Sequence, residues 1–243
     1  MKRTLLVCLS LVLSSLASAL DFLNTSFEAA EGFTTGALDS QNGWNALGGF
    51  SVVDTIAKSG TQSVEWDGSD GAWFAWASIP GGYSGAEEVT GSVSIFLDPA
   101  SATVDRVYGL ALWNDFDLVV GITLCSDGTI RGGPTTSDLW DGSGIGTYSS
   151  SAIGAWIDIS LAYIPGETTA MAKVGNNSFA LDATPASNLT DFDLYSDYVD
   201  DFDSSSIAYY DNYRVGTPNP VPEPVSMAVL GVGLLVLSRR KKA

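Results

Sequence analysis

Short runs of β-branched and aromatic residues constrain this chain more than any other feature. They recur along the sequence and are separated by Gly, Pro, Asn and Asp. No apolar pattern with helical spacing continues between them for more than a turn or two. Runs of this kind predict strands. We expect strands at 50–55, 63–66, 72–77, 91–97, 107–113, 118–124, 156–163, 169–173 and 207–215.

The stretch WIDISLAY at 156–163 alternates most clearly. Its odd-numbered residues are Ile, Ile, Leu and Tyr, and its even-numbered residues are Trp, Asp, Ser and Ala. This predicts a strand with one face on a core and one nearer water. The sequence SDGT at 126–129 is typical of a hairpin turn, and IPGE at 164–167 of another turn. About nine to twelve short strands predict an all-β fold, a two-sheet antiparallel jelly-roll sandwich, over residues 20–216.

Residues 1–19 have the pattern of a secretory signal peptide. Lys2 and Arg3 precede an apolar run at 5–16, and Ala17 and Ala19 frame a cleavage site. We expect signal peptidase to cut after Ala19. A membrane anchor or a buried helix is the alternative, which the short run and the cleavage pattern disfavour. Cleavage removes Cys8 and leaves Cys125, for which we expect a buried, unreactive thiol rather than a reactive one.

The charge of the chain limits its partners. Residues 20–218 contain 27 acidic residues against five cations, a formal charge of −22. Such a surface repels nucleic acid and anionic lipid. It suits an extracellular protein or one that collects divalent cations, so we expect no nucleic-acid partner.

The absence of histidine limits the chemistry. The chain has no His, which excludes histidine-dependent triads and histidine metal sites. A glycosidase works with two carboxylates and needs no His. No strand carries the Glu-x-Asp-x-Glu or Glu-x-Asp-x-x-Glu spacing of jelly-roll glucanases, so we expect no enzymatic activity and no catalytic residues. A closely spaced, buried carboxylate pair in a cleft would instead favour the glycosidase.

The densest acidic stretch is DFDLYSDYVDDFD at 191–203. Carboxylate oxygens at this density suit Ca²⁺, the only cofactor that the sequence suggests. Candidate ligands are Asp191, Asp193 and Asp197. The stretch does not follow the spacing of an EF-hand loop. The alternative is a solvated acidic loop with aromatic residues packed beneath it.

Several tryptophans lie close to acidic residues in the sequence. Rings that stack on sugar C–H groups beside carboxylates that bind hydroxyls are typical of a carbohydrate-binding face. The tryptophans are Trp66, Trp73, Trp76 and Trp113, and the acids are Asp67, Asp70, Asp115 and Asp117. Candidate carbohydrate contacts are Trp66, Trp73 and Trp113. Alternation in WDGSDGAWFAWAS turns about half of its rings inward, so we expect core packing for most of them.

The start and the end of the body resemble one known fold family. The stretch 22–66 is similar to the first strands of concanavalin A-like (laminin-G-like) jelly-roll domains of secreted bacterial proteins. The matching residues are Phe27, Glu28, Gly32, Phe33, Gly43, Trp44, Ser59, Gly60 and Ser63. IAYYDNYRV at 207–215 resembles the last strand of that family. The resemblance implies that this strand pairs near the first one, at 23–28, and it says little about function. At Asp211-Asn212 we expect a bulge whose side chains bond to backbone amides or a cation.

The C-terminal residues resemble a second family feature. A Pro-rich linker at 217–224 contains Pro222, Glu223 and Pro224, and an apolar run at 225–237 follows it. A basic cluster comes next: Arg239, Arg240, Lys241 and Lys242. This resembles the PEP-CTERM sorting signal of Gram-negative bacteria. The resemblance implies processing by an exosortase-like membrane enzyme.

The same resemblance implies a short transmembrane helix within 225–243 that anchors the protein transiently in the inner membrane. The run of ~13 residues reaches ~20 Å, against a hydrocarbon core of ~30 Å. Bilayer thinning or extension of the flanking arginines can close this gap. A buried C-terminal helix is the alternative, and it leaves the prolines and the basic cluster unexplained.

These observations predict an exported, non-enzymatic surface or extracellular-matrix protein. Its expected partners are signal peptidase, an exosortase-like enzyme and exopolysaccharide. The alternative function is that of a carbohydrate-binding module in an exopolysaccharide matrix.

Deletion of residues 221–243 tests the sorting signal. We expect cleavage after Ala19 to continue, because the signal peptide is separate from the tail. The truncated body should then be released without sorting, which fractionation of cells and medium would detect. An envelope distribution equal to that of the full chain would contradict the sorting interpretation.

Overall fold

The computed structural model describes residues 20–68, 74–99, 106–149, 152–198 and 207–218. Residues Asp21–Thr217 form one compact unit. The predicted signal peptide, the sorting motif and the membrane helix lie outside the described residues. Within these ranges, no helix is long and apolar enough to cross a membrane.

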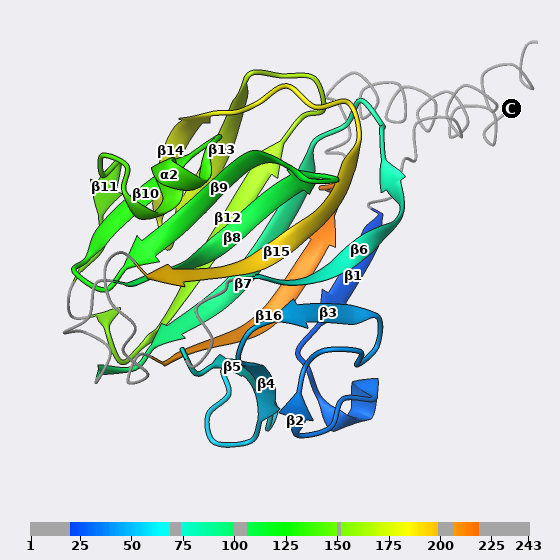
Figure 1. The fold of residues 1–243 in the computed structure, drawn as a ribbon, viewed down its shortest axis with the longest axis vertical. Coiled ribbons are helices and arrows are strands. Elements are labelled where there is room, and N and C mark those ends of the chain that lie inside the picture. The colour runs from blue at the N-terminus through cyan, green and yellow to red at the C-terminus, as the bar shows by residue number, and fades with distance from the viewer. Residues whose placement is uncertain (1–19, 69–73, 100–105, 150–151, 199–206, 219–243) are drawn as a thin grey trace, which may run out of the picture. The chain divides into compact units, whose positions relative to one another are not determined.

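One sheet contains nine strands. Figure 1 shows β12, β7 and β16 side by side in this layer. Its order is β14 (Asn177–Asp182), β13 (Thr169–Val174), β12 (Trp156–Tyr163), β7 (Val89–Leu97), β16 (Ala208–Gly216), β5 (Ser63–Trp66), β4 (Phe50–Val53) and β2 (Gly36–Ala37), with β1 (Asp21–Thr25) also paired to β16.

The second sheet contains seven strands and lies in front of the first in Figure 1. Its order is β11 (Gly146–Thr147), β10 (Thr129–Gly133), β9 (Asp117–Cys125), β8 (Arg106–Asn114), β15 (Leu189–Tyr198), β6 (Phe74–Tyr83) and β3 (Trp44–Leu47). A 3-10 helix, η1 (Ala29–Glu31), and a short helix, α2 (Thr136–Trp140), complete the described elements. The predicted two-sheet antiparallel sandwich is confirmed.

The core lies between the inner faces of the two sheets. In β12 the predicted apolar face is buried, and Asp158 on the other face is exposed. Cys125 is buried in a second, smaller cluster, as expected. The turn at 126–129 joins β9 to β10, and Gly128 in it has a φ of +91°. Period-two alternation therefore predicted both the strand and its buried face.

The acidic stretch that begins at Asp191 differs from the solvated loop that was the alternative to a calcium site. Its first part is not a solvated loop but part of β15, which pairs with β8 on one side and with β6 on the other. Phe192 and Leu194 of this strand are buried in the core between the sheets. The sequence did not predict this central strand, because Asp occupies every second position at its start and Asp is depleted in strands on average.

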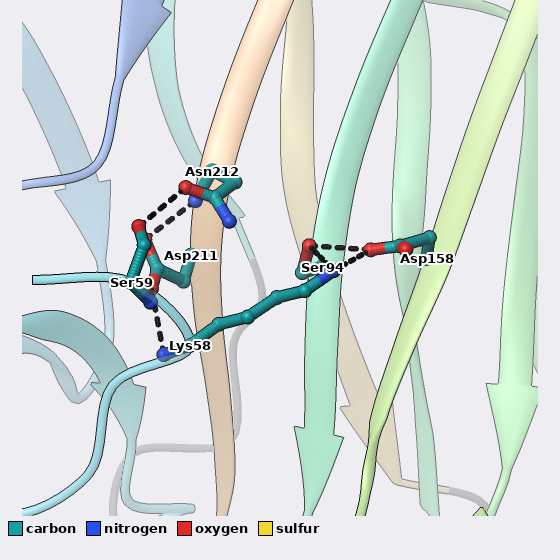
Figure 2. Close-up of polar contacts among 6 residues, drawn as sticks. All are labelled: Lys58, Ser59, Ser94, Asp158, Asp211 and Asn212. Carbon is teal, nitrogen blue, oxygen red and sulfur yellow. Dashed lines mark hydrogen bonds and ion pairs between the residues drawn. The ribbon is translucent and has the colours of Figure 1, made fainter.

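The bulge predicted in β16 is present. The pairing with β7 shifts between Asp211 and Arg214, and Asn212 has a φ of +54°. The buried carboxylate of Asp211 accepts hydrogen bonds from the backbone N–H groups of Lys58 (2.8 Å) and Ser59 (2.9 Å). The Ser59 hydroxyl donates to Asn212 Oδ1 at 2.7 Å (Figure 2). The bulge therefore fixes the loop between β4 and β5.

A second carboxylate holds the same loop. Glu28 accepts hydrogen bonds from the N–H groups of Thr61 (2.8 Å) and Gln62 (3.0 Å). Gly60 has a φ of +67°, and a Cβ atom there would lie 2.1 Å from Glu28 Oε1. The glycine is required both by its backbone conformation and by this close approach.

The two ends of the compact unit meet, as the family resemblance implied. Strand β1 pairs with β16, with Leu23 opposite Val215. Arg214 and Asp21 form an ion pair of 2.6 Å beside this pairing. Strand β16 thus joins β7 on one edge to β5 and β1 on the other.

Truncation tests the role of β16. A chain ending at residue 205 loses β16, and we expect it not to fold, because β7, β5 and β1 lose their shared partner. A chain ending at residue 217 keeps every described strand and should melt cooperatively. Circular dichroism during thermal unfolding would distinguish the two. A soluble, cooperatively melting fragment 20–205 would show that β16 is dispensable.

Candidate functional site

Helix α2 covers part of the outer face of the seven-stranded sheet. Its first turn is capped by Thr135, whose hydroxyl oxygen accepts from the N–H of Asp138. Leu139 packs on Gly121 of β9, where a Cβ atom would come within 2.8 Å of its methyl groups. The Thr123 hydroxyl donates to the Leu139 carbonyl at 2.7 Å. These contacts fix α2 over β9 and β10. The outer face of the sheet from β8 to β3 is formed by other residues.

A pocket of about 300 Å³ opens on this face beside β8. Its lining combines apolar and acidic side chains: Leu47, Phe74, Trp76, Trp113, Asp115, Phe116, Asp191 and Asp193. A second pocket of about 310 Å³ shares Asp115, Phe116 and Asp191 with the first, so the two adjoin. Among the described residues, no Lys or Arg lines either pocket. We call the two together the aromatic–acidic groove.

Alternation along two neighbouring strands builds the groove. Strand β15 turns Phe192 and Leu194 toward the core, which leaves Asp191 and Asp193 on the outer face. In β6, Ala75 and Ala77 enter the core, and Trp76 points outward into the groove. Pairing places Asp191 opposite Trp113 of β8, and Asp193 opposite Trp76. Opposite residues in antiparallel strands share a face, so each ring lies beside a carboxyl group.

Aromatic contacts position the rings of the groove. Phe74 and Trp113 meet edge to face, with ring centroids 5.2 Å apart and planes at 87°. The turn from β8 to β9 contains Asp115, whose φ of +54° is that of a left-handed turn residue. The next residue, Phe116, is 96% exposed. The groove therefore has a wall of packed aromatic side chains and one exposed ring, that of Phe116.

Asp193 is the unusual group of the site. Its side chain is only 5% exposed, and its Oδ1 atom has no hydrogen-bond partner among the residues that the structure describes. Burial raises the pKa of Asp193 well above its usual value, and the negative charge of Asp191 and a hydrogen bond between the two carboxyl groups raise it further. Oδ1 of Asp193 is left as an acceptor without a donor.

The three predicted calcium ligands do not come together. Asp191 and Asp193 meet, but Asp197 lies further along β15 and accepts a hydrogen bond from the Tyr195 hydroxyl at 2.8 Å. Four residues of a strand span ~13 Å, which separates Asp197 from Asp193. Within the described ranges, no group of three or more acidic, His or Cys side chains is arranged to hold a metal ion. These three aspartates therefore do not form one site by themselves in the described structure, and calcium binding stays a prediction.

The predicted carbohydrate contacts divide in three ways. Trp113 lines the groove. Trp66 does not, because it is fully buried in the core beside Tyr108 and beneath the Arg106 guanidinium. Trp73 lies outside the described residues. The sequence analysis missed Phe74 and Phe116 and did not select Trp76. An aromatic residue at the turn sequence WNDFD was the available signal for Phe116.

A separate polar group lies on the nine-stranded sheet (Figure 2). Lys58 forms an ion pair with Asp158 and donates to Ser94 Oγ at 3.0 Å, while Ser94 donates to Asp158 at 2.6 Å. Burial acts to raise the pKa of Asp158, but the hydrogen bonds from Lys58 and Ser94 hold it below its usual value. Because Lys58 donates to Ser94, it does not act as a base for that hydroxyl. This group ties the loop of Lys58 to β7 and β12.

The C-terminal residues match a known family model. Residues 220–242 match the model described as the PEP-CTERM protein-sorting motif. The motif marks the protein for export, for transient membrane anchoring and for processing by an exosortase, a membrane enzyme. No curated protein sequence matches the chain.

Solved structures with a similar fold include polysaccharide lyases and a toxin domain. Alginate lyase vAL-1 from Chlorella virus has a TM-score of 0.51 and 12% identity, over 72% of this chain and 92% of the lyase. A family 7 alginate lyase in complex with substrate has a TM-score of 0.50 and 11% identity, over 72% of this chain and 84% of that one. The receptor-binding domain of botulinum neurotoxin mosaic serotype C/D has a TM-score of 0.54 and 10% identity, over 87% and 50%. Such low identities show the jelly-roll fold alone.

Replacement of Asp193 tests the electrostatics of the groove. Because the folded protein keeps the Asp193 proton to a higher pH than the unfolded chain, the free energy of unfolding should fall as pH rises above the usual Asp pKa of 3.8. Asp193→Asn removes this loss. We therefore expect the variant to be more stable than the unaltered protein at neutral pH, and the difference to shrink as the pH falls toward 3.8.

Denaturant unfolding at several pH values measures this effect. Asp182→Asn, which changes an exposed carboxylate on β14 of the other sheet, controls for the loss of one negative charge. Equal stabilisation by the two substitutions would show that Asp193 titrates normally.

Proposed function

We propose that this exported protein is a non-enzymatic surface or matrix protein whose jelly-roll body binds a carbohydrate in the aromatic–acidic groove. One observation carries the proposal. The rings of Trp76 and Trp113 lie on the same sheet face as Asp191 and Asp193, in adjoining pockets with room for small molecules. Aromatic faces pack on the C–H groups of sugars, and carboxyl oxygens accept from sugar hydroxyls.

The shape of the groove supports this use. Its two adjoining pockets, each of about 300 Å³, have the size of small-molecule sites. They extend from Leu47 at one end to Gly82 and Thr190 at the other. A ligand with more than one sugar ring can occupy both. The exposed ring of Phe116 lines both pockets and can contact neighbouring sugar units.

The similar fold of the alginate lyases does not extend to the chemistry of the groove. Alginate is a polyanion, and a site for it requires cations. The groove presents three carboxyl groups and has no Lys or Arg in its lining. The negative charges of alginate and those of the groove would repel each other. A neutral or cationic saccharide is therefore the better ligand.

The paired carboxyl groups raise the alternative of a glycosidase. Asp191 and Asp193 are the closely spaced, partly buried pair in a cleft that this activity would need. However, Asp191 and Asp193 are two residues apart on one face of β15. Carboxyl groups that act on a glycosidic bond stand ~5–5.5 Å apart in retaining enzymes and ~6.5–9.5 Å apart in inverting ones. Two carboxyl groups side by side on one strand do not flank a glycosidic bond from opposite sides, which supports binding rather than hydrolysis.

Export determines which carbohydrates the protein can meet. The sorting motif takes the protein out of the cytoplasm, and the body carries a formal charge of −22 over residues 20–218. Exopolysaccharide at the cell surface or in a matrix is the ligand that we propose there. The sorting motif and the groove would then act in sequence, the first to place the protein and the second to attach it to polysaccharide.

Substitution of Trp76 tests the proposal. In Trp76→Ala the groove loses a stacking ring, and we expect affinity for a bound oligosaccharide to fall about tenfold or more, which corresponds to ~1.4 kcal/mol. Titration calorimetry on the exported protein, after a glycan array has identified a ligand, measures the change. Trp156→Ala provides the matched control, because Trp156 is partly exposed on β12 of the other sheet, where it contacts Phe96. An equal loss in both variants, or no glycan bound by the unaltered protein, would contradict the proposed function.

A further inference from the structure

We propose that the aromatic–acidic groove selects a sugar that carries a protonated amine, such as a unit of a deacetylated amino-sugar polymer. This inference rests on the proposed carbohydrate-binding function and names its ligand class. Three independent features of the groove support it: the sign of its charge, an unused buried acceptor, and the placement of its rings.

The sign of the charge is the first feature. Asp115 and Asp191 line the groove beside Asp193, and among the described residues no Lys or Arg joins them in the lining. Although burial raises the pKa of Asp193, a cation bound next to it favours its ionised form. Elsewhere on the body, two described carboxylates pair with cations, Asp158 with Lys58 and Asp21 with Arg214. The described lining of the groove therefore contains acidic groups but no cation. A ligand with a positive charge supplies that partner.

The unused acceptor is the second feature. Oδ1 of Asp193 is buried and has no hydrogen-bond partner in the described part of the chain, although the residue lines the pocket. A buried acceptor without a donor lowers stability, and a ligand that donates to it recovers that loss. An ammonium group has three donors and no acceptor. It can therefore bond to Asp193 Oδ1 and still donate to Asp191, and a bond from a charged donor is stronger than one from a hydroxyl.

The placement of the rings is the third feature. Trp76 lies opposite Asp193 in the sheet, and Trp113 lies opposite Asp191. Phe74 of β6 lies opposite Tyr195 of β15, and its ring contacts that of Trp113. The negative faces of aromatic rings attract a cation within about 6 Å. A cation held by the two carboxyl groups would thus also have aromatic rings beside it.

A metal ion fits the same residues less well. Ca²⁺ takes six to eight oxygen ligands, and most of the lining around Asp193 consists of apolar side chains. Within the described part of the chain, acidic side chains do not assemble in threes at metal-binding geometry. An organic cation uses both the oxygens and the rings.

Calorimetry with three uncharged or cationic oligosaccharides of equal length tests the inference. The probes are β-1,4-linked oligomers of glucosamine, of N-acetylglucosamine and of glucose, titrated into the exported protein at about pH 6, where an amine is protonated. We expect the glucosamine oligomer to bind at least about tenfold more tightly than the other two. Asp193→Asn should reduce this preference to about threefold or less, because a bound ammonium favours the ionised form of Asp193 and Asn cannot ionise, and it should leave the binding of the glucose oligomer within about twofold.

Two controls separate the groove from general effects. Asp182→Asn removes an exposed carboxylate from β14 and should keep the full preference for the amine. Thermal unfolding of each variant shows that it is folded, and Asp193→Asn is expected to be the more stable protein. A loss of preference equal in both variants would mean that the overall charge of the body attracts the amine, and the inference would be wrong.

The remaining outcomes distinguish the inference from the proposed function. Equal affinity for all three oligomers would overturn the amine selectivity and leave carbohydrate binding intact. Absence of binding to any oligosaccharide, on the calorimeter and on a glycan array, would overturn both. If millimolar Ca²⁺ bound to the unaltered protein but not to Asp193→Asn, and displaced the glucosamine oligomer, the groove would be a metal site and the inference would fail.

Discussion

The period-two alternation of β15 is the constraint on which the rest of the structure depends. This strand lies inside the seven-stranded sheet between β8 and β6. It turns Phe192 and Leu194 into the core and leaves Asp191 and Asp193 on the outer face. A shift of one residue would exchange the two faces and place the carboxyl groups in the core. The burial of the apolar residues therefore fixes the position of the acidic ones, and one register determines both the core and the groove.

A second constraint is the anchoring of the loop between β4 and β5. It involves residues through which the sequence resembles jelly-roll domains. Glu28 and the buried Asp211 both accept N–H groups of the loop between β4 and β5, and Gly60 allows this close approach. Strand β16, which carries Asp211, pairs with β1 and joins the ends of the compact unit. The residues through which the sequence resembles a jelly-roll family thus serve folding. The groove is built from other residues, so the resemblance predicts the fold and not the ligand.

The sequence predicted those parts of the structure that depend on local pattern. The face of β12, the turn at 126–129 and the bulge at Asp211 all follow from residues that are near neighbours in the chain. The groove depends on which strands pair, and local alternation does not specify this. Trp66 and Trp76 illustrate the limit: both lie in alternating segments, yet one faces the core and the other the groove. The contact between Asp191 and Asp193, and the unpaired acceptor that it leaves, depend on burial by β6 and β8.

Two-dimensional NMR of the tryptophan indole N–H groups tests the central claim most directly, because it locates the ligand on the protein. The chain has seven tryptophans, and single substitutions assign their signals. During titration with a glucosamine oligomer, the account predicts shifts of the Trp76 and Trp113 signals. The signals of Trp66, in the core, and of Trp156, on the other sheet, should stay in place. Shifts confined to Trp156, with Trp76 and Trp113 unchanged, would place the ligand on the nine-stranded sheet and contradict the account.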